Sequence, residues 1–134
     1  MIAIDVAKAM TTPVRTVTPD ATMVEAAREL RDGAIGALVI VENDDIVGMV
    51  TESDIVTLVT AGAGLETATV GECMISPVMT IRSDDTVMQA GERMREASVR
   101  RLPVVDDDEL VGIVTTTDLA YYLPRLRTAI RRER

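Results

Sequence analysis

Two stretches of the chain combine apolar runs with short polar breaks. The runs "ALVIVE" at 37–42 and "LPVVD" at 102–106 are almost continuously apolar, as buried strands are. An acidic break follows each, "NDD" or "DDDE", and then comes a second apolar run, "IVGMVT" at 46–51 or "LVGIVT" at 110–115. Apolar runs separated by a few turn-forming residues predict two β-hairpins.

Apolar residues at helical spacing precede each predicted hairpin. Thr22-x-x-Glu25 and Thr86-x-x-Gln89 have the pattern of capping boxes, in which side chains satisfy backbone N–H groups at a helix start. Apolar positions then recur every three or four residues, which predicts one amphipathic helix in each stretch. These positions are Met23, Ala26, Ala27 and Leu30 in the first stretch and Val87, Ala90 and Met94 in the second.

Shorter elements lead into these helices. "DVAKAM" and "TVGECM" predict short helical turns, with Asp5 and Thr69 as N-caps. Pro13 and Pro77 end these turns, because proline cannot continue a helix. The segments that follow, "VRTVTP" and "VMTIRS", predict short strands.

The same elements occur twice in the same order. Shifting the chain by 64 positions aligns residues 6–55 with 70–119 without a gap, and 17 of the 50 pairs are identical. The joint "TAGAGLETAT", 60–69, is small and contains Gly, as a linker should. Each half is predicted as strand–helix–strand–strand–helix, an α+β fold. Because halves of this size bury little surface alone, we expect them to pack sheet to sheet about a pseudo-two-fold axis.

The duplicated pattern resembles a pair of CBS domains, the arrangement called a Bateman module. The strings that carry the resemblance are "AMTTPVRTVTPDAT" and "LVIVENDDIVGMVTESDI" in the first half and "CMISPVMTIRSDDT" and "RRLPVVDDDELVGIVTTTDL" in the second. The resemblance covers roughly residues 5 to 123. It implies tandem CBS repeats at 5–62 and 69–123, each β-α-β-β-α, with a basic C-terminal tail at 124–134.

One motif carries candidate chemistry in both halves. Thr51-x-x-Asp54 and Thr115-x-x-Asp118 lie where a predicted strand enters a helix, and the first turn of a helix has unpaired N–H groups that suit a phosphate. An ionised carboxylate only accepts hydrogen bonds, so the Asp side chain can accept one from each of the two ribose hydroxyls. The same pattern is also a capping box, and on the motif alone capping is favoured over ligand binding. The family resemblance reverses that order for the two aspartates.

The resemblance implies two ligand sites that mix the halves. Their adenosine-containing ligand would be AMP, ADP, ATP, S-adenosylmethionine or a similar molecule, and no cofactor is required. The first site would combine Thr115 and Asp118 with Thr16, Ala21, Ile35, Gly36 and Ala37. The second would combine Thr51 and Asp54 with Thr80, Asp85, Val99, Arg100 and Arg101.

The two implied sites are not equivalent. Arg100 and Arg101 offer planar guanidinium groups to phosphate oxygens, whereas Gly36 and Ala37 stand at the matching positions of the first half. In the implied arrangement the arginines project near the middle of the module, so the phosphates of a ligand at either site could use them. An alternative interpretation pairs the arginines with acidic neighbours on a solvated face. Glu52 would repel a phosphate placed close to it. The site of Asp118 is therefore the favoured nucleotide site.

Composition narrows the class of protein. The net charge of −8 over 134 residues argues against a nucleic-acid partner, and a chain without Phe or Trp has almost no means of stacking bases. With 13 Arg and one Lys, this acidity suggests a high-salt source. The single Cys73 excludes an internal disulfide, and the absence of His excludes His-based acid–base or metal chemistry. With no signal-peptide pattern or long apolar run, a cytoplasmic protein is expected, without a membrane partner and with no metal site.

The leading hypothesis is a stand-alone CBS pair that senses an adenosine-containing ligand and is not an enzyme, since no nucleophile–base pair is present. The family implies that occupancy is transmitted through the geometry of a homodimer or of a protein partner. The alternative hypothesis is an apo dimerisation or protein-interaction module with no small-molecule ligand. The tail "LPRLRTAIRRER" could form an amphipathic helix that docks on the acidic body, on a dimer mate, or on RNA, DNA or a partner protein, and the first two are favoured.

Overall fold

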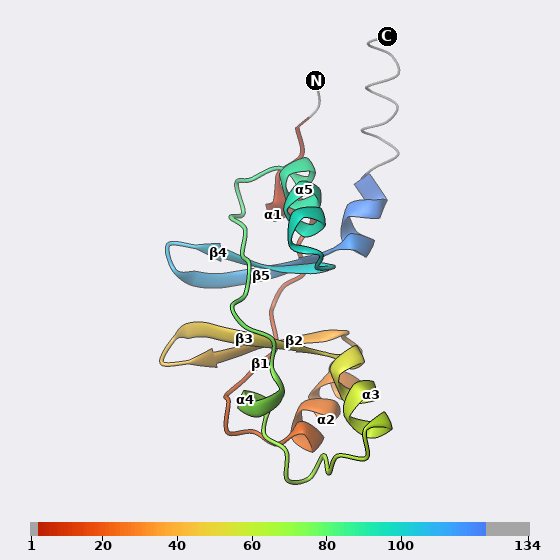
Figure 1. The fold of residues 1–134 in the computed structure, drawn as a ribbon. Helices are drawn as coiled ribbons and strands as arrows, with labels where there is room; N and C mark the ends of the chain where they lie inside the picture. Colours follow the sequence, from red (N-terminus) through yellow and green to blue (C-terminus); the bar gives the residue numbers. More distant parts are fainter. Residues whose placement is uncertain (1–2, 123–134) are drawn as a thin grey trace. The chain divides into compact units, whose positions relative to one another are not determined.

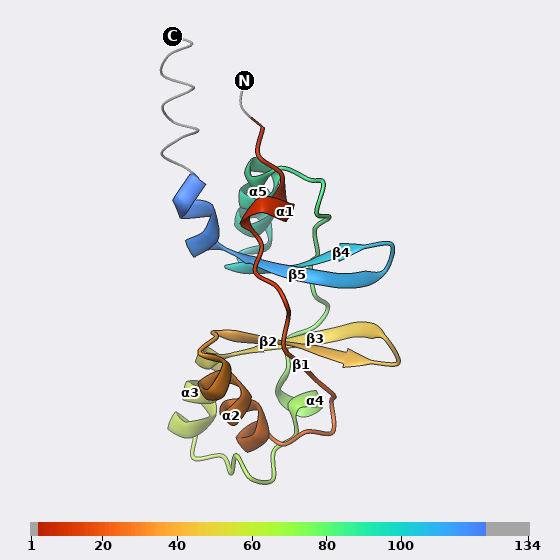
Figure 2. The same ribbon diagram turned by 180° about the vertical axis from the view of Figure 1, so that it is seen from behind.

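The computed structural model describes residues 3–122, which form two compact units (Figures 1 and 2). Unit 2 is continuous and spans residues 14–78. Unit 1 is discontinuous, because residues 3–13 belong with residues 79–122. The predicted basic tail at 124–134 lies outside the described residues.

Unit 2 is a three-stranded sheet with its helices on one face (Figure 1). Strand β1 runs parallel to β2, and β2 forms an antiparallel hairpin with β3. Its elements are β1 (Thr16–Val17), α2 (Met23–Gly33), β2 (Ala37–Glu42), β3 (Asp45–Thr51), α3 (Glu52–Thr60) and α4 (Val70–Cys73).

Unit 1 repeats this plan around the second hairpin. Strands β4 and β5 are antiparallel, and β5 runs directly into helical residues 116–122. The named elements of unit 1 are α1 (Val6–Ala9), α5 (Val87–Ala97), β4 (Arg101–Asp106) and β5 (Glu109–Thr115). Both predicted hairpins and the α+β class are therefore confirmed, whereas the packing of one sheet against the other stays a prediction.

Both hairpins turn through two residues with positive φ. These are Asn43 and Asp44 (52° and 67°) in the first hairpin and Asp107 and Asp108 (49° and 65°) in the second. Positive φ at both central positions is the geometry of a type I′ turn, which favours Asn, Asp and Gly because they tolerate the left-handed region. The acidic breaks of the sequence are thus the turns themselves.

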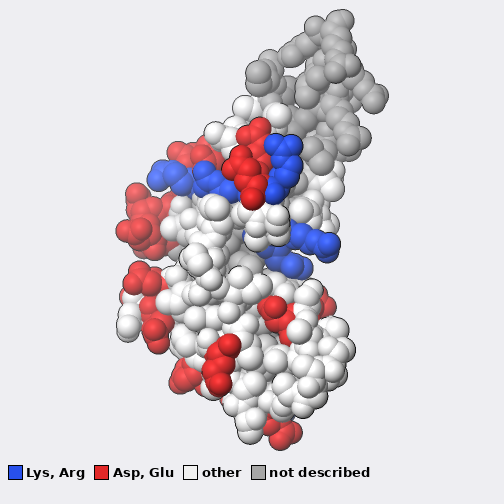
Figure 3. Space-filling model, viewed as in Figure 1, with Lys and Arg blue, Asp and Glu red and all other residues white. Residues whose placement is uncertain are grey.

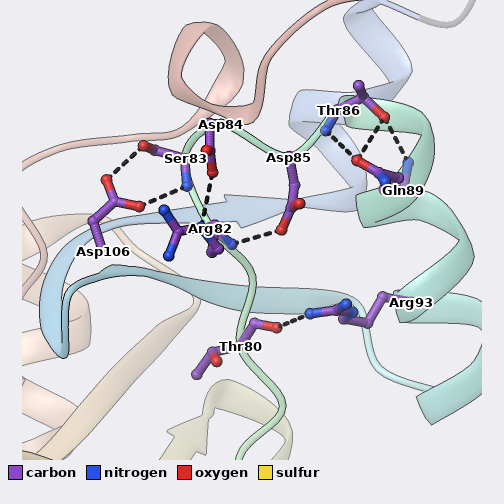
Figure 4. Close-up of polar contacts among 9 residues, drawn as sticks. All are labelled: Thr80, Arg82, Ser83, Asp84, Asp85, Thr86, Gln89, Arg93 and Asp106. Atoms are coloured by element: carbon purple, nitrogen blue, oxygen red, sulfur yellow. Dashed lines mark hydrogen bonds and ion pairs between the residues drawn. The ribbon is translucent and has the colours of Figure 1, made fainter.

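One of the two predicted capping boxes is complete, and the other is half formed. In unit 1 the Thr86 hydroxyl accepts the Gln89 N–H at 3.2 Å, and the Gln89 side chain accepts the Thr86 N–H at 2.8 Å (Figure 4). In unit 2 the Thr22 hydroxyl accepts the Glu25 N–H at 3.1 Å, but within the described chain the Glu25 side chain makes no bond in return. The α2 start is therefore held by half of the predicted pair.

The predicted strand at 78–83 is reduced to a single parallel bridge between Ile81 and Val104. The next contact along the chain is made by a side chain. The Ser83 N–H donates to Asp106 Oδ1 at 3.0 Å, and the Ser83 hydroxyl donates to the other oxygen of that carboxylate (Figure 4). Hydrogen bonds to the Asp106 carboxylate lower its pKa.

Residues 5–13 and 69–77, which we call the leading segments, begin the two sequence repeats. Each leading segment packs in the unit built from the other repeat. Thr11 forms an antiparallel bridge with Ile113, and Ile75 forms the corresponding bridge with Met49. Met10 lies against Gly112, and likewise Met74 lies against Gly48. The two segments are therefore exchanged reciprocally, so the compact units do not coincide with the repeats along the sequence.

Each unit has its own aliphatic core. Buried residues of α1, α5, β4 and β5 form the core of unit 1, with Leu119 from the helical segment. Those of α2, β2, β3 and α4 form the core of unit 2. Val, Leu, Ile, Met and Ala supply both cores. Among residues 3–122 no helix combines the length and apolar character needed to cross a membrane.

Candidate functional site

The Thr-x-x-Asp motif of unit 1 lies where β5 meets helical residues 116–122. The Thr115 N–H donates to Asp118 Oδ2 at 2.9 Å, and the Thr115 hydroxyl donates to the same oxygen at 3.1 Å. The Asp118 N–H donates back to the Thr115 hydroxyl at 3.2 Å. The motif thus caps the helix, as the capping interpretation predicts.

Unit 2 repeats this arrangement where β3 meets α3. The Thr51 N–H donates to Asp54 Oδ2 at 2.7 Å, and the Thr51 hydroxyl donates to it at 3.2 Å. In both motifs one carboxylate oxygen takes these bonds, and Oδ1 accepts no hydrogen bond from residues 3–122. Both aspartates are half-buried. Each carboxylate therefore keeps one acceptor oxygen available after capping.

Each motif lies beside the wall residues of its own unit. Thr51 pairs with Ala37 across the first hairpin, and Thr115 pairs with Arg101 across the second. We call these two places the unit 2 corner (Gly36, Ala37, Thr51, Glu52 and Asp54) and the unit 1 corner (Arg100, Arg101, Thr115, Thr116 and Asp118).

A backbone bond closes each corner. The Glu52 N–H donates to the Gly36 carbonyl at 3.1 Å, and the Thr116 N–H donates to the Arg100 carbonyl at 2.9 Å. The two corners therefore have the same backbone frame and differ in their side chains.

The fourteen predicted site residues divide evenly between the units. Thr16, Ala21, Ile35, Gly36, Ala37, Thr51 and Asp54 lie in unit 2, and Thr80, Asp85, Val99, Arg100, Arg101, Thr115 and Asp118 lie in unit 1. The structure thus brings each aspartate together with the wall residues of its own corner. The combination of each aspartate with the walls of the opposite repeat stays a prediction.

Several predicted wall residues also support their own loops. The Asp85 carboxylate accepts the Arg82 N–H at 3.0 Å (Figure 4). The Asp85 carbonyl accepts the Val6 N–H at 2.7 Å. The Ala21 carbonyl accepts the Val70 N–H at 2.8 Å. Asp85 therefore helps to dock the leading segment, a role that sequence reasoning did not assign to it.

Arg93 is a further residue that sequence reasoning missed. Its Nη1 donates to the Thr80 carbonyl at 2.7 Å, so it tethers a predicted wall residue to α5 (Figure 4). At the matching place in unit 2, Arg15 next to Thr16 bonds Glu29 of α2 at 2.9 Å. The sequence feature that could have indicated this role is the reversal of charge between the matched positions 29 and 93, which hold Glu and Arg.

The two corners differ in charge. Arg100 and Arg101 form no ion pair with any residue of the described chain, although Arg15, Arg31 and Arg82 all pair with nearby acids. Neither arginine therefore makes an ion pair within residues 3–122, and the same holds for Arg28, Arg93 and Arg95. The face of unit 2 drawn in Figure 3 shows acidic and no basic side chains, whereas the same view of unit 1 shows both.

A mostly apolar groove adjoins the unit 2 corner. It has a volume of about 570 Å³ and lies between α2 and α3. The predicted site residues Ile35 and Gly36 line this groove, and so does Glu52 of the unit 2 corner. The remaining lining residues are Ala27, Leu30, Arg31, Ala34, Ile55 and Val56.

Cys73 lies near the same corner and is half-buried against the unit 2 core. Burial raises the pKa of its thiol, and the negative charges of Glu72 and Asp54 raise it further. A thiol in such surroundings is a poor nucleophile, because the thiolate is the reactive form. Within residues 3–122 no group of three or more His, Cys, Asp or Glu side chains is placed to hold a metal ion.

Comparison with known proteins identifies the repeats. The family model described as "CBS domain" matches residues 3–61 and again residues 70–125. The CBS domain-containing protein YhcV of Bacillus subtilis is 37% identical over 83% of this chain and 79% of its own length. An uncharacterized protein of Methanopyrus kandleri, MK0525, is 36% identical over 99% of this chain and 69% of its own.

A solved structure extends this likeness to three dimensions. The CBS domain pair of the protein MJ0100, crystallised with 5′-methylthioadenosine and S-adenosyl-L-methionine, matches with a TM-score of 0.83 and 28% identity. The match covers 92% of this chain and 98% of that one.

Proposed function

This chain belongs to the CBS-domain family, and from that premise we propose that it is a regulatory module that binds an adenosine-containing ligand. It leaves the ligand chemically unchanged. The proposed ligands are AMP, ADP, ATP and S-adenosylmethionine. The solved pair that holds two adenosine derivatives supports this class of ligand.

One observation carries the proposal. Asp54 and Asp118 each hold their helix start through Oδ2 and leave Oδ1 without a hydrogen bond from the described residues. A carboxylate oxygen is a strong acceptor, and two neighbouring ribose hydroxyls are donors placed to use it. Capping also fixes the carboxylate in one orientation, which lowers the entropy that a ligand would lose on binding.

In the proposed complex, each ligand is bound by residues of both repeats, as predicted. The ribose binds the aspartate of one repeat, and the base lies against wall residues of the other, which at Asp118 would be Thr16, Ala21, Ile35, Gly36 and Ala37. Occupancy changes the geometry of a homodimer or the affinity for a protein partner. A ligand can drive such a change only by the difference in its affinity for the two states.

Isothermal titration calorimetry with AMP, ATP and S-adenosylmethionine tests the proposal, using Asp118→Asn and Asp54→Asn. Asparagine keeps one oxygen to accept the threonine N–H but carries a donor in place of the second oxygen. We expect folding to be nearly unchanged and affinity to fall by about 10- to 100-fold, the usual value of a charged hydrogen bond.

A matched control is Gln89→Ala, which removes the return bond of a capping box outside both corners. It should lower thermal stability and leave ligand affinity unchanged. If the original chain binds none of the three ligands, or if both Asn variants bind them normally, the proposed function is wrong.

A second candidate function, a dimerisation or protein-interaction module without a small ligand, has its own supporting observation. Val56 and Val59 on α3 are 61% and 59% exposed, and Val56 also lines the apolar groove. Exposed apolar patches of this kind mark contact surfaces. Under this alternative, Val56→Asp changes the sedimentation coefficient of the protein while none of the three nucleoside ligands binds.

A further inference from the structure

The groove between α2 and α3 of unit 2 runs beside a helix that packs little of its surface. Helix α3 has no buried residue. Val56 and Val59 are 61% and 59% exposed, and Val56 lines the groove of about 570 Å³ together with mostly apolar side chains. Covering exposed apolar surface is favourable, so a helix with this exposure beside an apolar groove indicates a contact surface.

The matching helical segment of unit 1 packs more closely. Leu119 is 7% exposed and belongs to the unit 1 core, whereas Ile55 at the matching position of α3 is half-buried. Leu119 also lies near Gly91 of α5, since a Cβ atom there would be 3.7 Å from its Cδ1. The small residue Ala120 stands at the position that matches Val56. The repeats therefore diverge at this surface, which points to a role specific to unit 2.

Charge narrows the class of occupant. Unit 2, residues 14–78, holds eleven Asp and Glu and three Arg, a net charge of −8 that equals the charge of the whole chain. In the groove, Arg31 bonds Asp32 at 3.0 Å, whereas Glu52 makes no ion pair within residues 3–122. An occupant that fits this groove therefore combines an apolar face with positive charge.

The chain contains a segment with both properties, the tail at 123–134, which lies outside the described residues. Its sequence places Leu123, Leu126 and Ile130 at helical spacing and carries five Arg and one Glu, a net charge of +4. Apolar residues three and four positions apart are the pattern of helices that bind in apolar grooves. The tail thus offers the apolar face and the charge that are complementary to unit 2.

We propose that the groove between α2 and α3 binds the tail of a second copy of this chain. The Tyr122 hydroxyl donates to the Lys8 carbonyl at 3.1 Å, so the residue that precedes the tail is held on unit 1. A second copy approaches the groove freely, so the contact requires no particular placement of one unit against the other. Each copy gives one tail and receives one, which closes the assembly as a two-fold dimer. The second contact forms within the complex made by the first, so the two reinforce each other.

Disulfide formation between two different single-thiol chains tests the contact. Cys73→Ala removes the one native thiol and supplies the residue found at the matching position, Ala9. In that background, one chain carries Val56→Cys and another carries Ile130→Cys. The two are mixed under mild oxidation, and the products are identified by mass spectrometry. The mixed disulfide should form about tenfold faster or more than with Ala120→Cys, the matched and exposed position of unit 1, in place of Val56→Cys.

Sedimentation velocity of the full chain gives a second, independent measurement. Val56→Asp and Ile130→Asp should each raise the dissociation constant of the dimer by about tenfold or more. The double variant should be little weaker than either single variant, because both changes remove the same contact. Ala120→Asp should leave the constant unchanged, and added salt should raise it by screening the attraction between the tail and unit 2. Far-UV circular dichroism checks that the variants fold.

Five results would overturn the inference. They are a monomeric original chain at all concentrations, dimerisation that neither Asp variant weakens, and a mixed disulfide that forms no faster than with Ala120→Cys. The fourth is a loss caused by Val56→Asp but not by Ile130→Asp, which would mean that another surface covers the groove. The fifth is a disulfide that forms inside single chains carrying both thiols, which would place the chain's own tail there. These measurements use no nucleoside, so their outcome is independent of the proposed function.

Discussion

Replacing Gly48 or Gly112 by alanine should destabilise the fold, because each glycine lies under a methionine of the exchanged leading segment. A Cβ atom at Gly112 would lie 2.6 Å from Met10 Sδ and 3.0 Å from its Cγ. A Cβ atom at Gly48 would lie 2.7 Å from Met74 Cγ and still closer to its Sδ. Favourable contacts between such atoms begin near 3.5 Å, so the methionine must move away from the strand.

The expected cost follows from the size of the clash. Adding one methyl group to a packed region typically costs about 1–3 kcal/mol. The clash reaches the Met74 Cβ at 3.0 Å as well as the flexible end of its side chain, so rotation about the outer bonds cannot relieve all of it. We expect a loss of about 2 kcal/mol in the free energy of unfolding, which for a chain of this length lowers Tm by roughly 6–10 °C.

Urea unfolding of single and double variants gives the assay. Met74→Ala should suppress the effect of Gly48→Ala and leave that of Gly112→Ala unchanged. Met10→Ala should do the opposite. Residues in contact show coupling free energies of about 0.5–3 kcal/mol in such cycles, whereas distant residues add independently. The pattern of suppression thus reports which leading segment packs on which hairpin.

Gly91→Ala is the control, because a Cβ there would meet only Leu119 Cδ1, at an ordinary 3.7 Å. In the middle of α5 this change should stabilise the protein by about 0.5–1 kcal/mol. Suppression of Gly48→Ala by Met10→Ala, rather than by Met74→Ala, would refute the exchange of segments. So would unchanged stability in both Gly48→Ala and Gly112→Ala.

Three further outcomes are expected. Bonds from Ser83 lower the pKa of Asp106 below its ordinary 3.8, so its stabilising contribution is present above that pH and lost as the pH falls further. Asp106→Asn should therefore weaken the dependence of stability on pH below about 4 in acid titrations followed by circular dichroism. Asp44→Gly and Asp108→Gly should each raise the free energy of unfolding by about 0.5–1 kcal/mol in urea titrations, because glycine adopts positive φ without a steric penalty. Thr86→Ala should lower the Tm measured by calorimetry, since losing an N-cap costs about 1 kcal/mol.

The elements of this fold could be predicted because their signals are local. The two hairpins follow from apolar runs around acidic turns, and the observed turns at 43–44 and 107–108 have the positive φ that such residues tolerate. The helix that begins after Thr86 follows from a complete capping box. Each of these signals lies within a few residues of the structure it predicts.

The exchange of leading segments could not be predicted in this way. Val6 and Val70 are identical residues at matched positions, and both are fully buried. Each would fit the apolar core of either unit, so the pattern along the chain does not say which unit receives which segment. The contact of Met10 with Gly112 does not make the choice either, because Met74 and Gly48 stand at the matched positions and make the same contact in the other unit.

The two interpretations of the Thr-x-x-Asp motif compete on the sequence and are compatible in the structure. Capping and ligand binding exclude each other only if the aspartate carboxylate is treated as a single hydrogen-bond acceptor. The carboxylate has two oxygens, and in Asp54 and Asp118 all the bonds from the preceding threonine go to one of them. In the proposed complex, capping prepares the ligand site, because it holds the second oxygen in a fixed direction before the ligand binds. It follows that a stability measurement alone cannot separate the two roles, and that Asn and Ala at these positions should differ more in stability than in ligand affinity.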